Sequence, residues 1–341
     1  MRADVAANPT RMKGTAPRAV SLQTIQQPIR SKLDDVSRAM GSIVASELPL
    51  VGQVSAHLLA MRGKLFRPTL LLLSSEVAET PEDRAVTLAA SLELIHLATL
   101  VHDDAVDHSA LRRGMPTVNA LFSHQISVIM GDFLYSTALT HLVGLGDLAA
   151  LQALTRASTE MTLGEMRQLA VTDPLSFTER EYDDLIRSKT ASLMRTACEL
   201  GALAGARDYY GALGAFGENL GMAFQITDDL LDYREVKETT GKPSGLDLRE
   251  HKVTLPLIHA LRDMSRASRA EVERLFAGDG ATDDDIAKVV QIVADGGGFE
   301  YARRRGEEFA ERAHDAVAQL PDTVARDSLS ASISYVMERH S

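Results

Sequence analysis

Apolar residues recur along most of the chain at spacings of three and four, which places them on one face of a helix. Stretches in which Val, Ile and Thr alternate with polar residues, the pattern of a strand, are scarce. The pattern therefore predicts an all-α protein. The helices expected are Ile25 to Leu48, Leu50 to Met61, Thr69 to Val77, one from Pro81 into the acidic stretch after Val101, one ending at Leu121, Ser127 to Val143, Leu148 to Asp173, Glu181 to Leu203, Tyr209 to Tyr233, Leu255 to Arg262, Arg269 to Phe276, Thr282 to Ala294, Phe299 to Gln319 and Asp322 to Arg339.

Glycine and proline mark the ends of these helices, and no low-complexity linker divides the chain. Pro68 suits the first turn of the helix that begins near Thr69. The loop from Thr240 to Gly245 cannot continue a helix, because it combines Gly with Pro. A chain of 341 residues could form one domain or two. Since no linker separates the helices, we expect a single orthogonal bundle.

The N-terminal segment differs in composition from the rest. Residues 1 to 22 contain four bases, one acid and two prolines, and they lack the apolar run of a secretory signal. An Arg-rich, acid-poor leader is typical of a transit peptide and also of a disordered tail. We expect a disordered tail over residues 1 to 22 and one domain over residues 23 to 341.

The charge and cysteine content narrow the class of protein. A formal net charge of -11 argues against nucleic acid as a partner, because phosphate backbones recruit basic surfaces. The single cysteine, Cys198, excludes an intramolecular disulfide and fits a reducing, cytoplasmic compartment. It lies in an apolar context and is expected to be a small buried residue. No apolar run approaches the ~20 residues of a membrane span, so no transmembrane segment is expected.

Two short acidic motifs carry the candidate chemistry: Asp103, Asp104 and Asp107, and then Asp228, Asp229 and Asp232. Residues one helical turn apart share a face, so each motif crowds three carboxylates with no base among them. A divalent cation offsets that repulsion. Magnesium takes one or two protein carboxylates and fills its other positions with phosphate oxygens. Because bases follow both motifs, the pattern indicates a magnesium site for a diphosphate.

These motifs resemble those of the trans-type polyprenyl diphosphate synthases. The first reads HDDxxD followed by RRGxPT, and the second reads FQxxDDxxD followed by GKPxGxDxxxxKxTLPLI, from Phe224 to Ile258. The resemblance covers nearly the whole chain after the first two dozen residues. It implies the isoprenoid synthase fold, long helices around a central cavity, and a homodimer. It also implies condensation of isopentenyl diphosphate with an allylic diphosphate, assisted by three magnesium ions, or by manganese, on the six aspartates.

The resemblance assigns roles to further residues. Those matching the site for isopentenyl diphosphate are Lys64, Arg67, His96 and Arg113, and those matching the site for the allylic diphosphate are Arg112, Lys189, Lys242 and Lys252. The backbone carbonyls of Lys189 and Thr190 and the side chain of Gln225 match groups that face the carbocation. One departure is Leu65, which stands where the family commonly has arginine. We expect isopentenyl diphosphate to bind in spite of this change.

The residues one turn before the first motif bear on product length. Ala98 and Thr99 should point from the metal site into the cavity, where each turn adds ~5 Å. In the family, bulky aromatic residues here stop growth at farnesyl or geranylgeranyl length. The small residues therefore predict a longer product, of the octaprenyl or heptaprenyl type that serves as a quinone side chain. The floor is expected deeper, on the helix that contains Met130, Phe133 and Leu134.

Several alternatives stay open. The product could be farnesyl or geranylgeranyl diphosphate, and the chain could be a non-catalytic subunit of a heteromeric synthase, although such subunits usually lack part of one motif. A terpene cyclase would share the ionisation step without needing Lys64, Arg67 and Arg113. A helical scaffold is the remaining reading. His96 alone would fit a structural helix histidine.

Two other charged runs are read as structural. Arg303 to Arg305 is expected to be a solvated face, since acids follow at helical spacing. The run Asp283 to Asp285 follows Thr282 and reads as a helix N-terminus rather than a third metal site.

Overall fold

The computed structural model describes residues 20–61, 63–234, 245–278 and 280–338. Within them the helices are α1 (Leu22–Gln26), η1 (Gln27–Ile29), α2 (Arg30–Ile43), α3 (Pro49–Ala60), α4 (Phe66–Glu76), α5 (Arg84–Val106), α6 (Val118–Leu121), α7 (His124–Gly144), α8 (Leu148–Leu169), η2 (Pro174–Ser176), α9 (Glu179–Ile186), η3 (Arg187–Ala191), α10 (Ser192–Leu203), η4 (Arg207–Tyr209), α11 (Tyr210–Arg234), α13 (Leu246–Arg249), α14 (Leu255–Arg262), α15 (Arg266–Ala277), α16 (Asp283–Asp295), α17 (Gly298–Val317) and α18 (Val324–Met337). The two strands in this part of the chain are β1 (Leu111–Arg112) and β2 (Met115–Pro116), paired antiparallel. The predicted all-α fold is confirmed.

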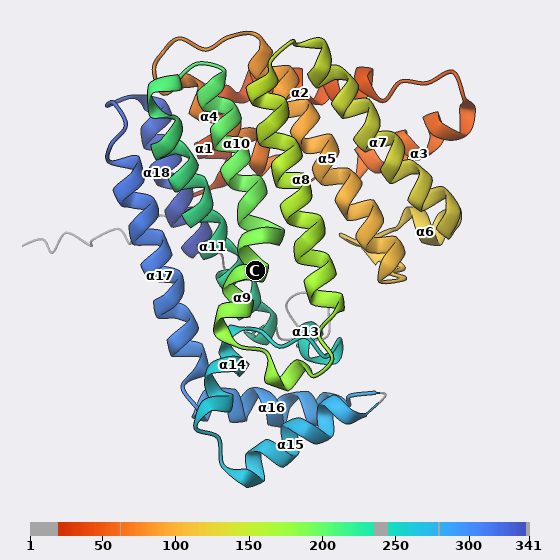
Figure 1. Cartoon of the computed structure of the whole chain (residues 1–341), viewed down its shortest axis with the longest axis vertical. Coiled ribbons are helices and arrows are strands. Elements are labelled where there is room, and N and C mark those ends of the chain that lie inside the picture. The colour runs from red at the N-terminus through yellow and green to blue at the C-terminus, as the bar shows by residue number, and fades with distance from the viewer. Residues whose placement is uncertain (1–19, 62, 235–244, 279, 339–341) are drawn as a thin grey trace, which may run out of the picture.

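The long helices run side by side, and α15 and α16 lie across one end of them (Figure 1). At the centre, α11 packs against α10 and α17, α10 packs against α4 and α8, and α5 packs against α7. Leu70 to Leu73 of α4 and most of α10 are fully buried. The apolar positions read from the sequence thus form one continuous core, as an orthogonal bundle requires.

Some predicted helices are divided. The helix expected from Ile25 to Leu48 is divided into α1, η1 and α2, because Pro28 interrupts the pattern of backbone hydrogen bonds. The last of these helices, α2, ends at Ile43. The helix expected from Glu181 to Leu203 contains the π-helical segment η3. The hairpin β1–β2 was not expected, because two-residue strands carry no hydrophobic pattern.

Two helices of the described residues, α5 and α7, are long and apolar enough to cross a membrane by length and composition alone, a test that a buried core helix also passes. In α5, 67% of the most apolar window is buried, as befits a core helix. In α7 the buried share is 33%. The outer face of α7 is therefore apolar and exposed, with Ile129 at 64% and Val143 at 61%.

The chain termini lie partly outside the described residues. The disordered tail expected over residues 1 to 22 falls on undescribed residues up to residue 19, whereas Ser21 already caps α1. Cys198 is fully buried, and burial raises its pKa to about 12, as expected of a structural residue. Asp283 to Asp285 form the first turn of α16, capped by Thr282, and Arg303 and Arg305 form ion pairs with neighbouring acids.

Candidate active site

A cavity of about 510 Å³ opens between α5, α8, the α9–η3–α10 stretch, α11 and the segment around Asp247 to Thr254. One part of its wall is polar, with carboxylates, lysines and an arginine. Another part is apolar and includes Leu100, Met161 and Leu193. Charged and apolar substrate groups could therefore bind side by side.

From α5, Asp103 and Asp107 line this cavity one turn apart, as predicted. The helix ends at Val106, and Asp107 caps it with its N–H donated to the carbonyl of Asp103 at 2.8 Å. Burial raises the pKa of Asp103 to about 6, against the opposing charge of Lys189. Burial makes the ionised form of this carboxylate unfavourable, and a bound cation would stabilise that form.

Asp104 is not among the residues that line the cavity, and it is paired with a base. Its two oxygens accept hydrogen bonds from Nε of Arg112 at 2.8 and 3.0 Å, and the carboxylate is 4% exposed. The hairpin β1–β2 returns Arg112 to the end of α5. No base lies among the first three acids in the sequence, but the turn folds Arg112 from further along the chain back onto Asp104.

In the second motif, each aspartate has a different environment. Asp229 is 6% exposed and lines the cavity, and its oxygens accept hydrogen bonds from Tyr182 Oη at 2.5 Å and Gln225 Nε2 at 2.8 Å. Asp232 accepts from the backbone N–H groups of residues 246 and 247, each at 3.0 Å. Asp228 is exposed. Burial, followed by the charge of Asp247, raises the pKa of Asp229 well above its usual range.

The two motifs meet at one cavity, since Asp103, Asp107 and Asp229 all line it. Asp247 adds a further carboxylate, whose pKa burial raises to about 7. Among the described residues, no group of three or more His, Cys, Asp or Glu side chains is arranged to hold a metal ion. The possible ligands are carboxylate oxygens, and more carboxylates than basic side chains line the cavity. That set fits a divalent cation completed by phosphate oxygens.

The predicted cations for an allylic diphosphate are partly engaged with acids. Lys189 Nζ lies 2.5 Å from Glu165 Oε2 and donates to Gln168 Oε1 at 2.9 Å. Lys252 lines the cavity and binds Glu250 at 2.6 Å, while Lys242 lies outside the described residues. Glu165 and Gln168 also line the cavity and were missed by the sequence reading. Their only signal was the three-residue spacing on the inner face of α8.

The residues predicted for isopentenyl diphosphate cluster beside the cavity. Arg67 and His96 line it, with Arg67 Nη1 2.9 Å from His96 Nε2. Burial, together with Arg67 and Arg113, lowers the pKa of His96 well below its usual range, so the imidazole is neutral. Arg113 Nη1 donates to the carbonyl of Met61 at 3.0 Å.

The loop before α4 carries the other member of this cluster. Lys64 is exposed, and its Nζ lies 3.4 Å from Tyr335 Oη of α18. Its carbonyl accepts from Gln26 Nε2 at 2.9 Å, which ties α1 to this loop. Leu65 follows with φ of 52°, a left-handed conformation that is costly for a leucine.

The π-helical segment η3 presents Lys189 and Thr190 to the cavity. Gly164 of α8 and Gly221 of α11 allow it to pack closely. A Cβ at Gly164 would lie 2.9 Å from Ser188 Cβ, and one at Gly221 would lie 2.5 Å from Ala191 Cα. The wide turn is thus held between two helices, as π-helical turns at functional sites often are.

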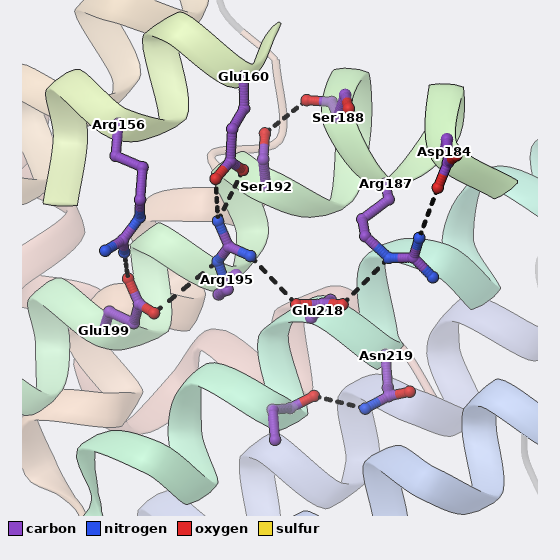
Figure 2. Close-up of polar contacts among 11 residues, drawn as sticks. Arg156, Glu160, Asp184, Arg187, Ser188, Ser192, Arg195, Glu199, Glu218 and Asn219 are labelled. Atoms are coloured by element: carbon purple, nitrogen blue, oxygen red, sulfur yellow. Dashed lines mark hydrogen bonds and ion pairs between the residues drawn. The ribbon is translucent and has the colours of Figure 1, made fainter. Parts of the chain in front are cut away.

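A network of polar contacts connects η3 to α10 and α11 (Figure 2). Ser192 Oγ donates to the carbonyl of Ser188 at 2.6 Å. Glu218 of α11 joins two arginines, with 3.3 Å to Arg187 Nε and 3.2 Å to Arg195 Nη1. Figure 2 shows that Arg195 also faces Glu160 and Glu199, so α8, α10 and α11 share one network of charges.

The residues predicted to govern chain length occupy different positions. Thr99 lines the cavity, whereas Ala98 is 2% exposed and is not among the lining residues. Five residues at about 100° each turn Ala98 some 140° away from the direction of Asp103. Met130 and Leu134 are buried, and they do not line the cavity either.

Comparison with known proteins identifies the family of the chain. A family model described as Polyprenyl synthetase matches residues 48–293. An all-trans-nonaprenyl-diphosphate synthase of Rhodobacter capsulatus, described as geranyl-diphosphate specific, is 38% identical over 90% of this chain and 94% of that protein. The octaprenyl diphosphate synthase of Escherichia coli is 35% identical over 94% of this chain and 99% of its own length.

A solved structure shares the whole architecture. The polyprenyl synthase from Caulobacter crescentus, crystallised with calcium and isoprenyl diphosphate, superimposes with a TM-score of 0.88. It is 32% identical and covers 96% of this chain and 100% of that one. The chain therefore belongs to the polyprenyl synthetase family and is a trans-prenyltransferase.

Proposed function

We propose that the protein condenses isopentenyl diphosphate with an allylic diphosphate, head to tail and in trans, to make a polyprenyl diphosphate longer than geranylgeranyl. One observation carries the proposal. Carboxylates of both aspartate motifs line the same cavity as Lys189, Lys252 and an apolar wall. Such a cavity suits a substrate with a diphosphate head and a hydrocarbon tail. The synthase domain is proposed to extend from residue 23 to residue 341.

The reaction is proposed to need magnesium. The residues that would hold the metal are Asp103 and Asp107 on α5 and the aspartates of the second motif on α11. The donor set supports this, and the Caulobacter crescentus relative was crystallised with calcium and isoprenyl diphosphate. Magnesium, when bound, supplies charge neutralisation on the diphosphate, which makes it a better leaving group. Three ions per site are proposed, with manganese as a substitute.

The side chains of the protein itself would bind and orient the two substrates. Lys189, Lys252 and Arg112 are proposed to receive the allylic diphosphate, with Lys189 exchanging Glu165 for a phosphate oxygen. Planar arginine binds phosphate through two parallel hydrogen bonds, and lysine adds a mobile charge. The neighbouring apolar wall would keep water from the allylic cation.

Isopentenyl diphosphate is proposed to bind at the cluster of Lys64, Arg67, His96 and Arg113. A neutral His96 can donate one hydrogen bond to phosphate without adding charge beside Arg67. Oxygen atoms of Thr190 and Gln225 would face the cation that forms when the allylic carbon–oxygen bond breaks. The new carbon–carbon bond forms to that cation, and the departing diphosphate takes the proton lost from the product.

The length of the product is inferred from relatives and from Thr99. The two curated relatives are named for nonaprenyl and octaprenyl products. Thr99 places a small side chain on the cavity wall one turn below Asp103. No aromatic side chain therefore blocks the wall at that point. We propose a product in this long range.

A homodimer in the cytoplasm is also proposed. The exposed apolar face of α7, including Ile129 and Val143, is a surface that a second copy could cover. Light scattering on the purified chain measures its mass in solution. A mass of one chain at micromolar concentration would refute the dimer.

One experiment separates the candidate functions. The purified chain is incubated with magnesium, labelled isopentenyl diphosphate and allylic primers of several lengths, and the dephosphorylated products are sized. We expect long polyprenols, and no turnover after chelation. Turnover of the allylic substrate without consumption of isopentenyl diphosphate would indicate a cyclase. Inactivity of the chain alone would indicate a subunit that needs a partner.

A further inference from the structure

Four side chains form a hydrogen-bonded chain between the cavity wall and the middle aspartate of the second motif. Thr190 Oγ1 donates to Gln225 Oε1 at 2.7 Å, and Gln225 Nε2 donates to Asp229 Oδ1 at 2.8 Å. Tyr182 Oη donates to Asp229 Oδ2 at 2.5 Å. The chain links η3, α11 and α9, which are three separate helical elements.

The direction of these hydrogen bonds follows from the partners of Asp229. Its Oδ2 accepts from Tyr182 Oη and its Oδ1 accepts from Gln225 Nε2, so the NH₂ group of Gln225 faces Asp229. The amide oxygen then points the other way, toward Thr190, whose hydroxyl hydrogen must bond to it. Thr190 and Gln225 consequently offer oxygen lone pairs, and not hydrogens, to the cavity that both line.

Tyr182 holds the far end of this chain. It is 2% exposed, and its hydroxyl donates to Asp229 Oδ2 from within the packed interior. With a donor on each oxygen, the carboxylate of Asp229 cannot rotate without losing a hydrogen bond. Asp229 is itself 6% exposed, and a lost partner there would be costly.

We propose that Tyr182 and Asp229 are positioning residues that fix the amide of Gln225, so that oxygen atoms face the allylic cation. This inference rests on the proposed function. Preoriented dipoles aimed at a developing charge lower the barrier without needing to reorganise during the reaction. A reversed amide would instead present its NH₂ group to the cation and raise the barrier.

The test is a double-mutant cycle of Tyr182→Phe and Gln225→Leu, measured by kcat, by KM for each substrate and by the magnesium concentration for half-maximal rate. Each single variant should lower kcat about tenfold, and the double variant should be no slower than the slower single one, because Tyr182 acts through Gln225. KM values and the magnesium requirement should change less than twofold. Tyr233→Phe is the matched control. Tyr233 is a buried tyrosine of α11 whose hydroxyl accepts from Thr254 at 3.2 Å, and its replacement should leave kcat unchanged.

Independent effects that multiply, or a shifted magnesium requirement in Tyr182→Phe, would overturn the proposal, because Tyr182 would then act by another route than the amide of Gln225. If Tyr182→Phe does not fold by thermal unfolding, Asp229→Asn replaces it in the cycle, and kcat is then compared at saturating magnesium, because Asp229 is also a proposed magnesium ligand; the expectation of non-additivity in kcat is the same. A wild-type enzyme that does not consume isopentenyl diphosphate would refute the proposed function. An active wild type with an unaffected Tyr182→Phe variant would refute only the positioning role.

Discussion

Replacing Gly221 by alanine should slow the reaction far more than it destabilises the protein. Gly221 lies on α11 where η3 crosses it, and an added Cβ would stand 2.5 Å from Ala191 Cα and 2.9 Å from Ala191 Cβ. Non-bonded carbon atoms prefer a separation of ~3.5 to 4 Å. The two elements would therefore have to separate by about 1 Å.

The thermodynamic effect combines two opposing terms. Overpacking a close contact costs ~1 to 3 kcal/mol, while exchanging glycine for alanine within a helix contributes ~0.5 to 1 kcal/mol in the other direction. The net loss of stability is therefore about 2.5 kcal/mol at most. The variant should remain folded, with a melting temperature lower by a few degrees.

The kinetic effect is expected to be larger, because the displaced atoms are those of the site. Thr190 precedes Ala191, and its 2.7 Å hydrogen bond is to Gln225, one turn beyond Gly221 on α11. A separation of about 1 Å breaks this bond, and a displacement of that size costs up to ~100-fold in rate. We expect kcat to fall between ten- and a hundredfold.

The assay pairs steady-state kinetics with thermal unfolding. Gly211→Ala is the control, because Gly211 lies on the same helix with no heavy atom within 4 Å of the added Cβ. That control should keep wild-type kcat and be equally or more stable. The reasoning is refuted if Gly221→Ala retains wild-type kcat, or if it loses activity only in proportion to unfolded protein.

Three further outcomes follow from the site. Burial raises the pKa of Asp103 to about 6 and that of Asp247 to about 7, so the native state holds protons that the unfolded chain has released above about pH 4. Denaturant titrations of the metal-free protein should therefore show an unfolding free energy that falls between about pH 4 and 7, and a flat profile would contradict this. Leu65→Arg restores the cation common in the family and should lower KM for isopentenyl diphosphate at unchanged kcat; equal KM values would show that the missing arginine is immaterial. Thr99→Phe should shorten the product, as seen by chromatography of the dephosphorylated chains, whereas Ala98→Phe should act mainly by overpacking the core; unchanged chain length in Thr99→Phe would refute this account of the cavity.

Helical periodicity and the two aspartate motifs were sufficient to predict the fold and the family. Such patterns can be read from a sequence because a buried helix face, or a set of carboxylates on one face, requires a fixed spacing of residues. Thr99 lines the cavity and Ala98 does not, although the sequence reading treated them alike. A step of five residues points to another side of the helix, and a reading by turns alone overlooks this difference.

The partners of the motif residues could not be read from the sequence. Arg112 reaches Asp104 only because the chain reverses at Arg113 and Gly114, both with positive φ. Tyr182 contacts Asp229 from another helix, and Glu165 contacts Lys189 from another helix. No local sequence pattern predicts such contacts. Pairings between distant segments depend on the packing of the whole bundle.

The π-helical turn η3 corresponds to the insertion of one residue into an otherwise continuous α-helix. Removing Ser188 would let α9 and α10 join as one uniform helix, with better backbone geometry and about 100° of rotation between its two halves. The side chains of α9, Tyr182 among them, would then be rotated relative to Lys189 and Thr190. In the proposed mechanism, the length of the chain at this one point therefore matters as much as the identity of its side chains.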